Sequence, residues 1–317
     1  MPISKFPKEK FRVGILCIII KLNMATLRDI KRRIVGVKST QQITKAMKMV
    51  AAARLRRAQT NIINARPYAD KIASMISILP TADDKASNIY FSSGEVKNVA
   101  LVVITADRGL CGAFNQNIIK EAEKYIDDEL KPNHINSKIY CVGKKSADYF
   151  VKRDYDVLKT DTGVFTSLNY SSALRISDIA ILKFLDKTFD KVILVYNTFI
   201  SIIQQKVVVK QLLPIKVEDK HGEQNVDDAD YIYEPVRNYI FEYLIPKYLK
   251  AQVWRALLES NAAELSARMT AMDNATTNAE EMIKSLNLKY NKERQAAITK
   301  EILEIVSGAN ALRASSQ

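Results

Sequence analysis

The longest stretch of the chain without glycine or proline lies near the C-terminus, between Pro246 and Gly308. It contains 61 residues, whereas an ordinary globular helix has about 11–12. Because glycine and proline are the strong helix breakers, this stretch predicts one very long helix. A helix over residues 240–312 would be about 110 Å long at about 1.5 Å per residue. A chain of 317 residues cannot enclose such a rod, so we expect it to project and to need a partner.

A heptad pattern within this stretch indicates a coiled coil. Ten positions step by alternating four and three residues, and nine of them are apolar or alanine: Leu258, Ala262, Leu265, Met269, Met272, Thr276, Ala279, Ile283, Leu286 and Tyr290. After Tyr290 the apolar set shifts to Ile298, Ile302, Ile305, Ala309 and Leu312. Such a stutter changes a supercoil locally, so we expect the tip to pack differently from the middle.

A second long helix is expected from Met24 to about Leu79, with Pro80 ending it. Its apolar stripe begins with Leu27, Ile30, Ile34 and Val37, and Ile43, Met47 and Val50 are expected to resume it after a polar break. Small residues recur in both long helices, which allows a close helix–helix approach. The sequence therefore predicts an antiparallel two-helix coiled coil, formed by the N- and C-terminal helices and closed by the domain between them.

The hydrophobic period changes between the two long helices. Strands are expected at 99–105, 139–142, 191–196 and 205–213, and helices at 113–130, 145–152 and 171–187. This alternation predicts the α/β class, with a largely parallel sheet in a central Rossmann-like domain. The expected boundaries are 1–23 for an N-terminal extension, 24–80 for the first coiled-coil helix, 81–97 for a linker, 98–215 for the α/β domain, 216–235 for a second linker and 236–317 for the C-terminal helix.

The charge of the chain points to an acidic partner. The net charge is +13 and the pI is about 9.4. Between Met24 and Arg66 there are eleven Lys or Arg residues, but Asp29 is the only acidic one, so pairing along the helix cannot balance them. Nucleic acid, an anionic membrane surface and an acidic protein face all fit this composition. The segment has no aromatic residue on which bases could stack, which counts against nucleic acid as the partner. A basic coiled-coil nucleic-acid binder nevertheless stays as an alternative.

Residues 1–23 differ from the rest. Four basic residues precede a short apolar run from Val13 to Ile20, which at eight residues is too short for a bilayer, since a spanning helix takes about 20. No A-x-A cleavage site follows. We expect an extension that is disordered or lies upstream of a natural start at Met24, with an organellar transit peptide as the alternative.

Few residues carry the usual catalytic or metal-binding patterns. The three cysteines form no CxxC pair, and His134 and His221 lie in predicted turns, so neither a disulfide framework nor a metal site is expected. The turn after the first strand lacks the third glycine of GxGxxG, and no nucleotide or other cofactor is predicted. We expect Asp107 and Arg108 to cap the next helix or to form a local salt bridge, and Cys111 to be a small buried side chain. An enzyme that uses Asp107, Arg108 and Cys111 as catalytic residues stays as an alternative.

Three segments together carry a family resemblance. They are MATLRDIKRRI with STQQITKAMKMVAAARLRRAQ (Ser39–Gln59), ITADRGLCGAFN (Ile104–Asn115) and NKERQAAITKEILEIVSGANAL (Asn291–Leu312). In this order they resemble the γ subunit of F-type ATP synthase, from Met24 to Leu312. The resemblance implies a central rotor shaft. It carries no catalytic residue of its own and transmits the proton-driven rotation of the membrane c-ring to the catalytic β subunits for ATP synthesis, or works in reverse to pump protons.

The resemblance also implies partners and contact residues. The expected partners are the alternating hexamer of α and β subunits, the ε subunit and the c-ring, with one copy of this chain per complex. Contacts with the hexamer are expected at Lys45, Met47, Lys48, Arg54, Arg294, Gln295, Thr299 and Glu301. A structural or inter-subunit role in the α/β domain is expected for Asp107, Arg108, Gly109, Cys111 and Gly112. The expected location is peripheral, on the cytoplasmic side of a bacterial inner membrane, with the mitochondrial matrix side as the alternative.

Overall fold

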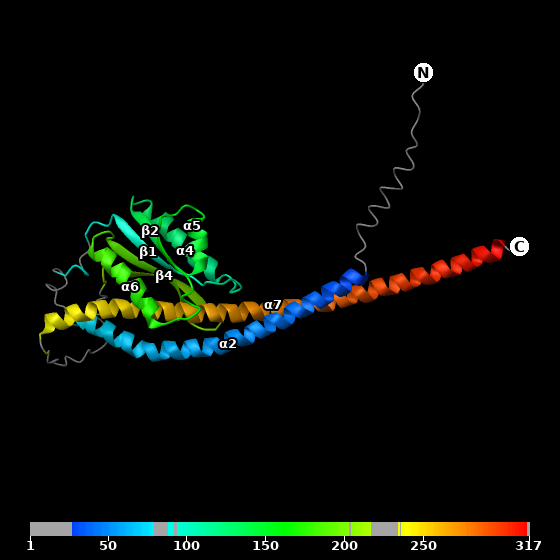
Figure 1. Cartoon of the computed structure of the whole chain (residues 1–317), viewed down its shortest axis with the longest axis horizontal. Helices are drawn as coiled ribbons and strands as arrows, with labels where there is room; N and C mark the ends of the chain where they lie inside the picture. The colour runs from blue at the N-terminus through cyan, green and yellow to red at the C-terminus, as the bar shows by residue number, and fades with distance from the viewer. Residues whose placement is uncertain are drawn as a thin grey trace, which may run out of the picture. The chain divides into compact units, whose positions relative to one another are not determined.

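The structure is a computed structural model that describes residues 27–78, 88–91, 94–202, 204–216, 234 and 236–315. The expectations for residues 1–23 and for most of the two linkers lie outside these residues. The chain divides into two compact units, and each is described by itself. The α/β unit contains residues 47–272, and the helical unit contains the described residues of 1–46 and 273–317. Two long helices, α2 (Leu27–Ile78) and α7 (Arg237–Ser315), contribute to both units (Figure 1).

A five-stranded sheet forms the centre of the α/β unit, in the order β3-β2-β1-β4-β5. Its strands are β1 (Asn98–Ile104), β2 (Asn136–Val142), β3 (Val157–Asp161), β4 (Lys191–Phe199) and β5 (Gln205–Leu213). The first four strands are parallel, and β5 runs antiparallel to β4. Six of the seven residues of β1 are buried, because a central parallel strand is covered on both faces. The predicted α/β class and the largely parallel sheet are confirmed.

Helices cover both faces of the sheet (Figure 1). On one face, Leu101 and Val103 pack against α4 (Phe114–Tyr125) and α5 (Lys144–Val151). On the other face, Val102 and Ile104 pack against α6 (Tyr170–Leu185) and α7. The helix expected over 113–130 continues past α4 as a single π turn, η1 (Ile126–Leu130). The sheet is thus the middle layer of a three-layer unit, and α7 forms part of one outer layer.

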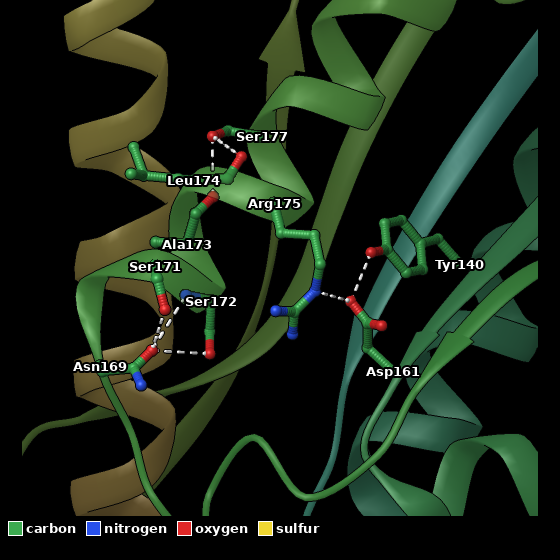
Figure 2. A network of polar contacts seen from close by, with 9 residues as sticks. All are labelled: Tyr140, Asp161, Asn169, Ser171, Ser172, Ala173, Leu174, Arg175 and Ser177. Carbon is green, nitrogen blue, oxygen red and sulfur yellow. Dashed lines mark hydrogen bonds and ion pairs between the residues drawn. The ribbon is translucent and has the colours of Figure 1, made fainter.

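A polar network fixes α6 to the carboxyl edge of the sheet (Figure 2). The Tyr140 hydroxyl donates to Asp161 Oδ2 at 2.6 Å, and Arg175 Nε of α6 donates to the same oxygen at 3.2 Å. Burial, followed by the hydrogen bond to Asp161, raises the pKa of Tyr140. The Asn169 side chain accepts from the Ser172 backbone N–H at 3.1 Å and caps the start of α6.

The predicted coiled coil is confirmed. In the α/β unit, apolar residues of α2 and α7 form one buried cluster: Leu55, Ala58, Ile62, Leu258, Ala262 and Leu265. In the helical unit, the hydroxyls of Thr44 and Thr276 lie 2.8 Å apart, and Gln41 Nε2 donates to Glu280 Oε1 at 2.9 Å. Gln41 comes before Thr44 along α2, whereas its partner Glu280 comes after Thr276 along α7. The two helices therefore run antiparallel.

The expected register of α2 is wrong at one place. Ile43 and Val50 are 58% and 53% exposed, and Met47 is only half-buried. The heptad spacing instead continues without a break through Gln41, Thr44, Lys48 and Ala51, all of which are buried or half-buried. The sequence suggested a break because polar residues occupy the seam here. The hydrogen bonds of Gln41 and Thr44 to α7 satisfy these groups, so the seam does not need apolar residues at these positions.

Candidate functional site

The loop that follows β1 ties three strand ends together through Asp107. Its Oδ1 accepts from the Gly163 N–H at 2.8 Å and from the Lys144 N–H at 3.1 Å. Lys144 opens α5 after β2, and Gly163 follows β3. The other oxygen, Asp107 Oδ2, is buried and lacks a hydrogen-bond partner among the described residues. Asp107 therefore acts here as an acceptor for backbone amides and caps α5, whereas the sequence favoured a cap on the helix directly after it.

The same loop also packs on α7. Arg268 Nη1 donates to the Gly109 carbonyl at 2.8 Å, and Arg268 also pairs with Glu264 one turn away. Burial raises the pKa of Glu264, against the opposing effect of the Arg268 charge. Gly112 has φ +58° and faces Ala271 of α7, while Arg108 is exposed. Glu264 and Arg268 were not predicted as functional residues, although their spacing of four residues is typical of a helical ion pair.

Cys111 lacks the features of an activated thiol. It is buried, and Asn115 Nδ2 lies 3.1 Å from its Sγ. Burial, followed by the charge of Glu264, raises the pKa of Cys111, which disfavours the nucleophilic thiolate. The described residues contain no group of three or more His, Cys, Asp or Glu side chains placed to hold a metal ion. Within these residues, the geometry at Cys111 fits a small buried side chain better than a nucleophile.

Replacing Asp107 by alanine should destabilise the chain by about 2–4 kcal/mol, because two backbone N–H groups lose a charged acceptor. Asp107→Asn keeps an oxygen at the Oδ1 position, so we expect it to lose less than half as much. Denaturant unfolding of the isolated chain measures both changes. Equal losses for the two variants would contradict the assigned role of Oδ1.

The basic part of α2 presents side chains of two kinds. Lys45 and Arg54 are exposed. Burial raises the pKa of Glu264, and the charge of Arg54, together with that of Arg268, opposes this rise. Met47 and Lys48 are half-buried, and Lys48 occupies a seam position. The large apolar side chains that are exposed on the same helix include Val35, Ile43, Met49, Val50 and Ile63. A mixture of exposed basic and apolar side chains is suited to an acidic protein surface more than to phosphates alone.

The end of α7 has a different environment. The seam residues Ile283, Leu286 and Tyr290 are half-buried, whereas every residue from Arg294 to Leu312 is exposed in the described part of the chain. The predicted contact residues Arg294, Gln295, Thr299 and Glu301 all lie in this exposed segment. The Thr299 hydroxyl donates to the Gln295 carbonyl of its own helix at 2.9 Å. Large apolar side chains are exposed among them: Ile298, Ile302, Leu303, Ile305, Val306 and Leu312.

Comparison with known proteins identifies the family. A family model described as "ATP synthase" matches residues 26–312. An ATP synthase gamma chain from Chlorobaculum parvum is 50% identical over 293 residues, which cover 92% of this chain and 100% of the relative. The chain belongs to the ATP synthase gamma-chain family. A gamma chain from Prosthecochloris aestuarii is similarly close, with 51% identity over 92% of this chain and 99% of its own length.

Solved structures of ATP synthase show the same fold. The central stalk and c-ring structure of the Tetrahymena thermophila mitochondrial enzyme contains a chain with TM-score 0.56 and 27% identity, covering 74% of this chain and 99% of that one. A chain of the Euglena gracilis mitochondrial enzyme has TM-score 0.64 and 22% identity, covering 92% and 96%. The predicted family, fold class and rotor-shaft function are confirmed, and these comparisons give no support to a nucleic-acid binder.

As a gamma chain, the protein is a component of the ATP synthase complex. Its described helices include none that is both long enough and apolar enough to cross a membrane.

Proposed function

We propose that this gamma chain works mechanically and performs no ATP chemistry itself. Its coiled coil turns inside the hexamer of α and β subunits, and its α/β domain meets the ε subunit and the c-ring. One copy serves each complex. Because the gamma-chain relatives are bacterial, we place the complex on the cytoplasmic side of the bacterial inner membrane. Proton flow turns the c-ring with the shaft, and the shaft drives the catalytic β subunits through their conformations in turn.

The observation that carries this proposal is the exposed end of α7. An isolated helix end that displays this many large apolar side chains marks a protein interaction surface. Arg294, Gln295, Thr299 and Glu301 place polar groups among them, and such polar contacts are easily exchanged as the shaft turns. A shaft held tightly in one orientation could not rotate, so we expect its contacts with the hexamer to differ little in free energy between orientations.

Reconstitution tests the proposal directly. The chain is assembled with the α, β and ε subunits and the membrane sector of a bacterial ATP synthase in vesicles, and ATP hydrolysis and ATP-driven proton uptake are measured together. We expect proton uptake only when the chain is present, and no ATP hydrolysis by the chain alone. Hydrolysis without any proton uptake in the complete assembly, or hydrolysis by the isolated chain, would contradict the mechanical role.

A further inference from the structure

Three buried polar side chains of α7 recur every seven residues. Gln252, Glu259 and Ser266 are 6%, 5% and 0% exposed. Residues seven apart lie nearly above one another on an α-helix, drifting by only about 20°, so the three share one side of α7. We call this set the polar key. Polar groups are rarely buried this deeply unless they are hydrogen-bonded, which makes their partners informative.

Every member of the polar key bonds to the hairpin formed by β4 and β5. The partners are Lys210 Nζ, which donates to Gln252 Oε1 at 2.8 Å; Thr198 Oγ1, which donates to Glu259 Oε2; and, for Ser266, the Ile202 carbonyl and Gln205 Nε2, the latter at 3.3 Å. The hairpin is therefore held at three levels along α7, by side chains that come from one side of the helix.

Glu259 extends this contact to α2. Its Oε1 accepts from Arg255 Nε at 2.9 Å, and Arg255 Nη1 lies 3.0 Å from Asp70 Oδ1 of α2. Burial alone would lower the pKa of Arg255, but the hydrogen bond and the charge of Glu259 raise it. A continuous row of polar contacts thus runs from β4 through α7 to α2, all within the α/β unit.

A slip of α7 by one turn would break these pairs. If α7 moved by one turn in either direction, the residue opposite Thr198 would become Ala256, Ala262 or Ala263, or else Arg255. Apolar packing is non-directional and resists such a slip weakly. A buried donor that loses its acceptor, in contrast, carries the full cost of its desolvation. The polar key therefore defines the rotational and axial position of α7 against the sheet.

We propose that the polar key is the joint through which torque passes between the α/β domain and α7, with Gln252, Glu259 and Ser266 acting as positioning residues. The inference rests on the proposed rotor function, in which force enters at the α/β domain and must reach the shaft without slip. The polar key resists rotation of α7 about its own axis. The Arg255–Asp70 pair transmits the same torque from α7 to α2.

The test uses the complete complex in vesicles and measures protons taken up per ATP hydrolysed. Glu259→Leu should raise the population of slipped states about tenfold and lower the proton-to-ATP ratio at least about twofold, while ATP hydrolysis persists. Glu259→Gln keeps an acceptor for Thr198, so this variant should have a proton-to-ATP ratio close to that of the wild type. A general loss of stability would not explain such a difference between the two variants. Glu242→Leu makes the same substitution at an exposed position of α7 and should leave the ratio unchanged.

The outcomes separate the two proposals. If the wild-type chain assembles but does not couple hydrolysis to proton uptake, the rotor function itself is wrong. If the wild type couples and Glu259→Leu gives the same ratio, the polar key does not transmit torque. Should Glu259→Leu fail to assemble, Thr198→Val decides, because it removes the donor while keeping the shape of the side chain. A ratio equal to that of the wild type would then overturn the inference, and a lowered ratio would support it.

Discussion

Lys45→Glu is expected to lower ATP-driven proton uptake by the assembled complex about tenfold, equivalent to about 1.4 kcal/mol, while the isolated chain unfolds as the wild type does. Lys45 is exposed on α2, in a segment with one acidic residue among many basic ones. Because we expect this basic segment to face an acidic surface of the hexamer, the reversal replaces an attraction by a like-charge contact, which costs more than removal of the charge alone.

The controls for this prediction separate the contact from general charge effects. Lys45→Gln removes the charge without reversing it, and we expect a smaller loss. Lys124→Glu makes the same reversal at an exposed position of α4 and should leave proton uptake unchanged. Lys48→Glu is a poorer test, because Lys48 is half-buried at a seam position and its change would disturb the coiled coil as well. Equal effects of Lys45→Glu and Lys124→Glu would exclude a specific contact at Lys45.

Gly143→Ala is expected to cost more than about 4 kcal/mol and to leave the α/β unit unfolded or insoluble. Gly143 has φ +100°, and a Cβ atom here would lie 2.0 Å from the Thr105 carbonyl oxygen and 2.7 Å from its carbon. These are backbone atoms, held in place by the hydrogen bond from the Thr105 N–H to the Val142 carbonyl at 2.8 Å. Relief of the clash would thus have to separate the ends of β1 and β2.

Two other glycines provide matched controls. Gly163 also has a positive φ, of +80°, but a Cβ atom added there would meet nothing within 4 Å, so Gly163→Ala should cost only the backbone strain of about 1–2 kcal/mol. Gly36 lies inside α2 with open space around it, and Gly36→Ala should stabilise the isolated chain by up to about 1 kcal/mol. Thermal and denaturant unfolding measure the two control variants, and the soluble yield and circular dichroism of Gly143→Ala show whether it folds at all. A mild effect of Gly143→Ala would contradict the described packing of the loop.

The parts of the fold that were predicted from sequence are those that local patterns specify. The heptads of α7 recur with fixed spacing over ten positions, and the central strands read as continuous apolar runs because both of their faces are covered. The edge strand β3 was missed. Its sequence, VLKTD, has two exposed residues among its five, and a half-exposed edge strand of this length lacks both patterns.

The other features that could not be predicted from the sequence depend on contacts between distant parts of the chain. The register of α2 was misread after Val37 because Gln41 and Thr44 are polar, and only their bonds to Glu280 and Thr276 explain how they fit the seam. The amides that bond to Asp107 come from residues 37 and 56 positions away, so sequence spacing could not reveal them. The predicted contacts with the hexamer stay predictions. The structure shows that most of these side chains are exposed, with Met47 and Lys48 half-buried.

The exposed end of α7 has a consequence for the life of the chain before it joins a complex. Side chains such as Ile302, Leu303, Ile305 and Val306 are exposed in the described structure, and exposed apolar surfaces promote self-association. In a newly synthesised chain, the partner subunits and other copies of the same chain therefore compete for binding to the exposed end of α7. Synthesis in balance with the partner subunits, or early capture of this end during assembly, would protect the chain from aggregation and proteolysis.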